Sequence, residues 1–548
     1  MSLRPLPFCP VPEETARVAH AAFPKGHPYL RIRDTLGALF SDEQFVGLYA
    51  TRGQPAEAPW RLALVSVIQF AEDLSDEQAA DAVRDRVAWK YLLALPLEDA
   101  GFDASVLCEF RDRLAEGGEE ELLFNTLLKH LREQQLLKAR LPQRTDATHV
   151  LAAIRTLHRL ELVGESVRGA LNTLAVVAPE WVLAVSEPAW SERYDRPFES
   201  RRLPKSEKQR TALAQTIGRD GVRLLSALYA PEAPPWLREL PAVQTLRQIW
   251  VEQFYHEGDT LRLRRVEDLP PAGQRVNSPY DPEARYAQKR ETQWIGYKVH
   301  FTETCDPDLP PLITDVQTTP ASVHDGAVLP QIQAKLSQRE LLPNRQFADG
   351  AYLEGSALVD SREQYGIELV GPVPEDVSWQ AREGTGYGVE AFELDWEAQR
   401  ARCPEGEASS GWRERKGKSG TFVVVSFPPG VCHACERRPD CTTAKTTGRQ
   451  LKLQPQSVHE ALTAGRQRAR TPEYEREYAV RAGIEGTHTQ AVRQCGLRQS
   501  RYVGEGKVRL QHLLIGTALN FLRVGAWYMG SPRARTRHGA FARLALAA

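Results

Sequence analysis

Three acidic residues that lie far apart in the chain could together bind divalent metal ions. Asp146 lies in the run RTDATHV, Asp349 ends the run RQFAD, and Glu485 lies in the stretch YAVRAGIEGTHTQAVR. Three carboxylates gathered at one point repel one another unless cations neutralise them. Mg²⁺ or Mn²⁺ suits such a site, because these hard cations take oxygen ligands and keep water molecules that a phosphate can replace. Two such ions about 4 Å apart can activate a nucleophile and stabilise a leaving oxygen in phosphoryl transfer.

Ordinary structural roles also account for single acids. An Asp at the end of a strand is more often a turn former or a helix cap. Four residues near the C-terminus are spaced by three, four and three positions: Tyr478, Arg481, Glu485 and His488. This spacing places them on one face of a helix. The alternative for the Arg–Glu pair is an exposed ion pair worth only tenths of a kcal/mol.

Basic residues accumulate toward the end of the chain. The whole chain has a net charge of −1, whereas the part from residue 461 onward carries 15 Lys and Arg against 5 Asp and Glu. Such a segment indicates a polyanionic partner, although a solvated basic face is the common alternative. The candidate phosphate- or DNA-binding residues are Tyr478, Arg481, Arg493, Arg498, Arg501 and Lys507. Lys289, Arg290 and Lys298 add charge in a segment that reads as a hairpin.

Four of the eight cysteines are spaced like the ligands of a metal knuckle. Cys432, Cys435 and Cys441 lie close together, and Cys403 could supply a fourth thiolate from across a β-like run. Four thiolates predict a structural Zn²⁺ site, and a set of free thiols is the alternative. The remaining cysteines have no such spacing and are expected to be buried apolar residues. Eight cysteines in a chain of 548 residues do not make a secreted disulfide scaffold, so a reducing cytoplasm is expected.

The elements that must position these residues follow from the periodicity of apolar residues. Residues 1–140 carry apolar residues at intervals of three and four, which predicts an all-α N-terminal domain. Residues 157–270 read as a second helical block. With that block set aside, residues 141–156 and 271–395 read as strand, two hairpin strands, helix, strand, helix and strand. This order predicts an α/β core whose mixed sheet holds Asp146 beside Asp349.

The rest of the chain divides into three parts. Residues 396–450, rich in Cys, Gly and basic residues, predict a small excursion from the core. Residues 456–530 predict helices, including the stretch 478–504, and residues 531–548 form a basic tail. The late apolar run is interrupted by Asn520 and Arg523, so it predicts a buried helix and no membrane span. The N-terminal residues lack the apolar core of a signal peptide.

Several motifs resemble those of DDE transposases from bacterial insertion sequences. YAVRAGIEGTHTQAVR resembles the Tyr-x2-Arg-x3-Glu-x6-Lys signature of that family. Tyr478, Arg481 and Glu485 match it, whereas the basic residue arrives one position late, at Arg493. RTDATHV and FADGAY resemble the first and second Asp motifs. The acidic helical start is similar to an InsH-type N-terminal domain, and the order of motifs is similar to the insertion-sequence group numbered eleven-eighty-two.

The resemblance implies an RNase H-like catalytic core and a metal-dependent transposase. Such an enzyme cuts double-stranded DNA at the terminal inverted repeats of its element and joins the freed 3′ hydroxyl to target DNA. Asp146, Asp349 and Glu485 would hold Mg²⁺ or Mn²⁺. Pairing of two DNA ends implies a homo-oligomer on DNA, acting in the cytoplasm at the nucleoid. The alternatives are a nuclease of the same fold without strand transfer and a domesticated protein that only binds DNA.

Overall fold

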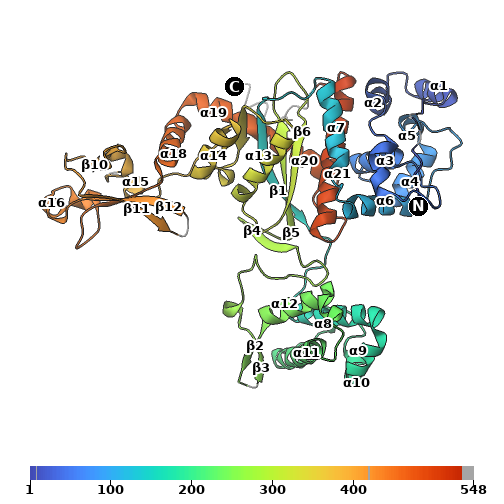
Figure 1. Ribbon diagram of the computed structural model, residues 1–548, viewed down its shortest axis with the longest axis horizontal. Helices are drawn as coiled ribbons and strands as arrows, with labels where there is room; N and C mark the ends of the chain where they lie inside the picture. Colours follow the sequence, from blue (N-terminus) through green and yellow to red (C-terminus); the bar gives the residue numbers. More distant parts are fainter. Residues whose placement is uncertain (6, 8, 259, 385, 418–419, 533–548) are drawn as a thin grey trace, which may run out of the picture.

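The computed structural model describes residues 1–532 apart from residues 6, 8, 259, 385, 418 and 419 (Figure 1). Residues 533–548, which make up nearly all of the basic tail expected at 531–548, lie outside the described residues.

A mixed sheet forms the centre of the molecule. Its order is β6-β5-β1-β7-β8, and β4 extends it beside the first residues of β5. β1 pairs antiparallel with β5 and parallel with β7, which in turn pairs parallel with β8. The strands are β1 (Gln143–Leu151), β4 (Arg285–Lys289), β5 (Thr292–Thr304), β6 (Ile313–Pro320), β7 (Arg345–Ala348) and β8 (Glu368–Val370). The predicted mixed α/β core is confirmed.

The pairing of β1 with β7 explains why two distant acids become neighbours. In this parallel pair Thr145 lies opposite Ala348. Asp146 and Asp349 are the next residues of these two strands, so they lie side by side. Asp146 continues along β1 opposite Phe301 of β5, whereas Asp349 lies directly after the end of β7. A shift of one residue in this register would send one of the two side chains to the opposite face.

Helices cover both faces of the sheet. On the face that carries Asp146, the ring of His488 in α20 contacts Phe301 at 5.8 Å between centroids, and Gly516 of α21 lies against Val316. On the other face, Gln333 of α13 donates to Gln346 and to Ser361 of α14. The four helices are α13 (Leu329–Gln338), α14 (Gly355–Tyr365), α20 (Gly483–Gln494) and α21 (Glu505–Tyr528).

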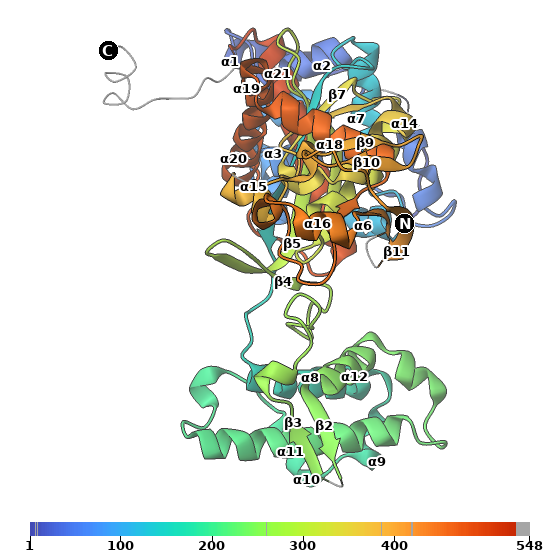
Figure 2. The same cartoon turned by 90° about the vertical axis from the view of Figure 1, so that its left-hand side faces the viewer.

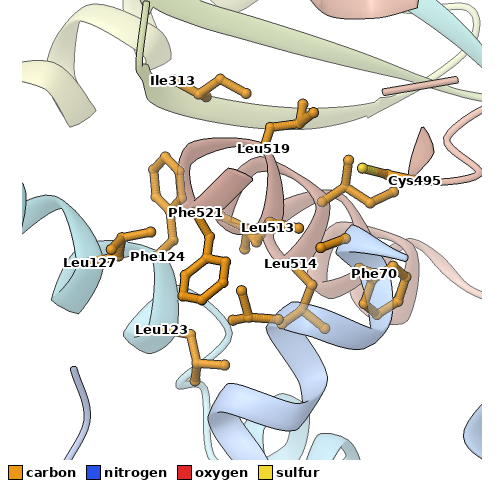
Figure 3. Close-up of a cluster of buried hydrophobic side chains, with 14 of the residues drawn as sticks. Phe70, Leu123, Phe124, Leu127, Ile313, Cys495, Leu513, Leu514, Leu519 and Phe521 are labelled. Carbon is orange, nitrogen blue, oxygen red and sulfur yellow. The ribbon is translucent and has the colours of Figure 1, made fainter. Parts of the chain in front are cut away.

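The N-terminal helices share one hydrophobic core with the sheet. They are α1 (Glu13–Ala22), α2 (Pro28–Leu36), α3 (Pro59–Ala71), α4 (Asp76–Asp85), α5 (Val87–Leu92), α6 (Ser105–Glu116) and α7 (Leu122–Glu133). Figure 3 shows α21 at their centre, with Phe521 near Phe124 of α7 and Leu519 near Ile313 of β6. The apolar surface of α21 is therefore buried by protein on nearly all sides. None of the helices described here combines the length and apolar character that a membrane crossing requires.

The block between β1 and β4 is a separate lobe with its own core (Figure 2). Its helices are α8 (Arg159–Val177), α9 (Pro179–Val185), α10 (Pro188–Arg193), α11 (Glu207–Leu228) and α12 (Pro241–Gln253). The helical block expected at 157–270 is wrong at its end, where the chain forms a hairpin: β2 (Phe254–Glu257) pairs with β3 (Thr260–Leu263). Gly258, with a φ of 59°, supplies the left-handed conformation that the connecting turn requires.

The Cys-rich part leaves the core after β8 and forms small sheets around a few apolar residues. The elements are α15 (Trp379–Glu383), β9 (Glu393–Asp395), β10 (Arg400–Arg402), β11 (Gly411–Gly417), β12 (Gly420–Ser426), α16 (Pro429–Ala434), α17 (Arg438–Cys441) and β13 (Gln450–Leu453). Its core contains Val425, Phe427 and Leu451. So few buried apolar residues give little stability of their own.

The C-terminal helices return the chain to the sheet. α18 (Gln456–Ala469) and α19 (Pro472–Tyr478) are followed by a 3₁₀ turn (Ala479–Ala482) and then by α20. The expectation of a helix through residue 504 is wrong beyond Gln494. Gly496 adopts a φ of 65°, a left-handed conformation that ends a helix.

Three buried histidines on the sheet and its covering helices are held neutral. Burial lowers the pKa of His300 and of His512 to about 3, and that of His488 to about 4. His300 contacts Tyr352 and Thr319, and Nδ1 of His512 lies 2.7 Å from the hydroxyl of Thr318. These rings serve as packing and hydrogen-bonding groups, because a positive charge at any of them would be desolvated.

We expect the protein to lose stability on mild acidification. Below pH 6.5 the unfolded histidines bind protons that the folded ones reject until about pH 4 for His488 and about pH 3 for His300 and His512, so the loss falls between pH 6.5 and about pH 3. Each histidine contributes about 1.4 kcal/mol per pH unit once its unfolded form is mainly protonated. Urea unfolding at several pH values measures the slope. The His512→Asn variant should reduce this pH dependence of the unfolding free energy by the equivalent of one proton. A urea midpoint that stays constant from pH 7 to pH 5 would contradict the expectation.

Candidate active site

The three acids singled out by the sequence surround one guanidinium group. Nη2 of Arg481 lies 2.7 Å from Oδ2 of Asp146 and 3.9 Å from Oδ2 of Asp349, and Nη1 lies 3.4 Å from Oε1 of Glu485. The side chains of Asp146, Asp349 and Glu485 are 11%, 40% and 67% exposed. Residues from three distant segments therefore converge on one cation, at a place that opens toward solvent through Glu485.

Backbone groups fix the two aspartates. The amide of Ala147 donates to Oδ1 of Asp146 at 2.9 Å, and the amide of Gly350 donates to Oδ1 of Asp349 at 2.6 Å. Asp349 thereby caps the short 3₁₀ turn Gly350–Tyr352. Asp349 thus has the capping role that is ordinary for an Asp. The second oxygen of each aspartate remains free to face Arg481.

Tyr478 connects the end of β7 to the helix that precedes the candidate site. Its hydroxyl donates to the carbonyl of Ala348 at 3.3 Å, and its ring stacks on Tyr474 with 5.6 Å between centroids. Burial raises the pKa of Tyr478 to about 12, so the phenol is neutral at physiological pH. Tyr478 is therefore an anchor for the turn that carries Arg481.

Burial raises the pKa of Asp146, against the opposing effect of Arg481 and of the Ala147 amide. A carboxylate with a raised pKa takes up a proton at higher pH than an exposed Asp does. Protons therefore compete with any cation for Asp146 over a wider range of pH than for an exposed carboxylate.

Among the described residues, no group of three or more His, Cys, Asp and Glu side chains is arranged so as to hold a metal ion. The three acids nonetheless offer the hard oxygen donors that Mg²⁺ and Mn²⁺ take. The guanidinium of Arg481 already collects these oxygens around one positive charge. The chemistry of the three donors suits a divalent cation, whereas in this structure their oxygens surround the guanidinium of Arg481.

The other predicted DNA-binding cations differ in what they contact. Arg501 donates to the carbonyl of Leu74 at 2.7 Å and lies over the ring of Phe70. Lys507 pairs with Asp112 at 2.8 Å, and Arg498 donates to the carbonyl of His149. These three side chains bind elements of the protein itself. Arg493 is exposed on α20, the helix of Glu485.

A cavity of about 610 Å³ opens beside the acids. Its lining includes Thr148, which lies two residues after Asp146 on β1, and Ala351, which lies two residues after Asp349. Its other functional groups include His149, Lys289, Trp294, Lys298 and His324, and also the acid Asp325, which pairs with Lys298. The rings of His149 and Trp294 lie 5.2 Å apart. Phosphates and bases both find suitable partners in such a cavity.

Two residues that lie near this site, Trp294 and Glu303, were not singled out in the sequence. Trp294 reads as an ordinary apolar residue of a strand. Glu303 is fully buried next to α20. It follows Val299 and Phe301 at intervals of two, and this charged residue on the apolar face of the strand was the available signal.

The four cysteines of the Cys-rich part share one cavity of about 630 Å³. The amide of Glu407 donates to Sγ of Cys403 at 3.3 Å, and that of Arg449 donates to Sγ of Cys432 at 3.4 Å. The pKa of Cys441 is raised by burial and by the three neighbouring thiols. Across the described chain these thiols are not closed into a metal-binding group, so they lie near one another without meeting at one point.

Two parts of the chain match known protein families. Residues 402–524 match the model of a transposase DDE domain, and residues 17–113 match that of a transposase domain named DUF772. These matches support a DDE transposase. The first match includes Arg481, Glu485 and the four clustered cysteines, and the second lies within the N-terminal helices.

A curated relative adds a shorter similarity. The chain is 31% identical over 84 residues to an uncharacterized protein, ORF8 in the nfe locus of Rhizobium meliloti. The aligned residues make up 15% of this chain and 41% of that protein, so the chain spans less than half the length of this relative.

Proposed function

We propose that this DDE transposase cuts DNA at the ends of an insertion sequence and joins the freed 3′ hydroxyl to target DNA. The observation that supports this proposal most strongly is that Asp146, Asp349 and Glu485 converge on Arg481. Two of these acids come from neighbouring parallel strands and the third from a helix that follows two insertions. A surface ion pair needs no such convergence. We assign the chain to the insertion-sequence group numbered eleven-eighty-two on the resemblance of its motifs.

The proposal includes an RNase H-like core. The strand order β6-β5-β1-β7-β8, with three antiparallel strands followed by two parallel ones, supports it. In this arrangement the first acid lies on the central strand and the second at the end of its parallel neighbour. The helical lobe and the Cys-rich part are then insertions on either side of the core strands.

Asp146 and Asp349 would hold Mg²⁺ or Mn²⁺, and Glu485 would complete the set. When bound, the ions supply an activated attacking oxygen and charge neutralisation at the leaving oxygen. Arg481 and Tyr478 orient the segment of Glu485 and bind phosphate near the cut. The buried side of Asp146 and the protein-covered face of α20 exclude water from all but the open side of the site.

Double-stranded DNA, both terminal repeats and target, is the proposed partner. Lys289 of β4 and Arg493 of α20 are exposed cations, and the cavity lined by Trp294 includes residues of the β4–β5 hairpin and the residues of β1 directly after Asp146. We still propose phosphate contacts for Arg498, Arg501 and Lys507. Each of these side chains would have to leave its partner within the protein in order to bind a phosphate. Because two DNA ends must be held together, we propose a homo-oligomer on DNA.

The test is an incubation of the purified protein with Mg²⁺ and a DNA fragment carrying the sequences that flank its gene. Joined products with target DNA are expected. Cleaved products without joining would indicate a nuclease instead. DNA binding without either product would indicate a domesticated DNA-binding protein. Products that do not depend on the flanking sequences would contradict the proposed recognition of element ends.

A structural zinc ion is the second part of the proposal. Cys403, Cys432, Cys435 and Cys441 would bind Zn²⁺ and stabilise a part of the chain that has little hydrophobic core. We expect the protein purified without chelator to contain about one zinc per chain. The Cys435→Ser variant should lose the metal, and a Cys108→Ser variant, which removes a thiol from the N-terminal helices, should keep it. Wild-type protein free of zinc after expression in zinc-supplemented medium would refute the site.

A further inference from the structure

A fully buried carboxylate lies behind the candidate active site. Glu303 belongs to β5, and its side chain has no solvent exposure. Its Oε1 accepts from Nε of Arg144 at 2.7 Å, and its Oε2 accepts from the hydroxyl of Thr487 at 2.6 Å and from Nη1 of Arg523 at 2.8 Å. One carboxylate thus contacts β1, α20 and α21 at once.

Both ends of this network lead to the acids of the site. Arg144 lies two residues before Asp146 on β1, so the two side chains share a face of the sheet. Nη1 of Arg144 also donates to the carbonyl of Val480 at 2.7 Å, directly before Arg481. Thr487 lies two residues after Glu485 on α20. The network therefore connects the strand of the first acid to the helix of the third.

A glycine shows how closely the two elements approach. A Cβ atom on Gly483, the first residue of α20, would lie 1.9 Å from Nη1 and 2.4 Å from Cζ of Arg144. Any larger residue would displace the guanidinium or move the start of the helix away from β1. Gly483 has an ordinary helical φ of −62°, which demands no glycine, so contact with Arg144 is the reason for its small size.

In this network one buried carboxylate faces two arginine cations whose side chains are 13% and 11% exposed. Burial alone would raise the pKa of Glu303, but Arg523 and Arg144 hold it below its usual value. The hydroxyl of Thr487 both donates to Glu303 and accepts from Nη2 of Arg523 at 2.6 Å. An ionised, fully hydrogen-bonded group of this kind fixes the orientation of its partners.

We propose that Glu303 is a positioning residue that sets the separation between Asp146 and Glu485 through Arg144 and Thr487. This role rests on the proposed function and deepens it. None of the four network residues touches the reacting groups, and each acts through the placement of the acids. Misplacement of reacting groups by about 1 Å can lower a rate by about 100-fold, so the network is expected to act on the chemical step and not on DNA affinity.

The test compares Thr487→Val with Thr487→Ser in single-turnover cleavage of a DNA end with Mg²⁺. Val keeps the shape and removes the hydroxyl, whereas Ser keeps the hydroxyl. We expect Thr487→Val to lower the cleavage rate constant by about 10- to 100-fold with an unchanged dissociation constant for DNA. Thr487→Ser should stay within about threefold of the wild type. Gly483→Ala should behave like Thr487→Val.

Thr517→Val is the matched control, because Thr517 is a buried helix residue of α21 whose hydroxyl donates only to the carbonyl of Leu513 at 2.8 Å among the described contacts. It should cleave at the wild-type rate. Equal rates for Thr487→Val, Gly483→Ala and the wild type would overturn the positioning role while leaving the proposed function intact. So would an equal loss in the Thr517→Val control, which would indicate general destabilisation. A wild-type protein that cuts no DNA end would remove the proposed function, and the positioning role with it.

Discussion

The Asp146→Asn variant is expected to lose DNA cleavage by at least about 1000-fold, which corresponds to about 4 kcal/mol of transition-state stabilisation. Asn keeps the shape of the side chain and its bond to the Ala147 amide, but it removes the charge that faces Arg481. The loss should fall on the rate of cleavage, because DNA binding depends on cations elsewhere. Single-turnover cleavage and a DNA-binding titration on the same preparation separate the two quantities.

Asp360→Asn is the control for this experiment. Asp360 is exposed on α14, on the opposite side of the sheet from Asp146 and α20. It should cleave DNA at the wild-type rate. Asp349 and Glu485 still face Arg481 in the Asp146→Asn variant, so the guanidinium keeps carboxylate partners and the variant should stay folded, which its melting temperature measures. Cleavage by Asp146→Asn within tenfold of the wild type would exclude Asp146 from the reaction.

The Arg481→Gln variant should become more dependent on divalent ions for its stability. Without the guanidinium, three carboxylates repel one another with no cation between them. A divalent ion that binds only the folded state then stabilises the variant more than the wild type, by about 1 to 3 kcal/mol at saturating concentration. DNA cleavage should fall by roughly 100-fold, because a charged group near the reacting phosphate is lost.

Thermal unfolding with and without Mg²⁺ measures this difference. Arg476→Gln is the control, because Arg476 is an exposed arginine of α19 whose contacts in the described structure, with Glu473 and the carbonyl of Pro472, lie within its own helix. Mg²⁺ should affect this control as it affects the wild type. If Mg²⁺ shifts the melting temperatures of Arg481→Gln and of the wild type equally, Arg481 does not occupy the place of the ions.

The sequence predicted the parts of the site that are marked by local patterns. Asp146 and Asp349 follow or interrupt short β-like runs, and the Tyr478–Arg481–Glu485 spacing is helical. Their meeting depends on the pairing of β1 with β7, which are about 200 residues apart in the chain. No local pattern specifies a register over such a separation, so the convergence could be stated only as a consequence of the expected fold.

The parts that the sequence did not reveal depend on tertiary packing. Glu303 becomes a buried hub only after α20 and α21 cover its face of the sheet. Arg501 and Lys507 look like phosphate ligands in the sequence, yet the structure bonds them to Leu74 and Asp112 of the N-terminal helices. The positive charge of Arg501 and Lys507 is evident from the sequence. The surface that each side chain contacts depends on how the distant N-terminal helices pack.

The hairpin at the end of the helical lobe shows a third limit. β2 and β3 follow directly from α12, and their residues, such as Glu257 and Arg262, are common in helices. Only Gly258 marked the turn. Two strands of four residues are too short for their alternation to outweigh a helical neighbourhood.

Protein cleavage by hydroxyl radicals from bound Fe²⁺ addresses the shared ion site most directly. Iron that replaces Mg²⁺ generates radicals beside its own ligands, and mass spectrometry locates the backbone cuts. Cuts clustered near residues 146, 349 and 485, suppressed by excess Mg²⁺ and absent from Asp146→Asn, are the predicted result. Cuts at only one of these segments, or a pattern of cuts that Mg²⁺ does not suppress, would contradict a shared binding site for divalent ions.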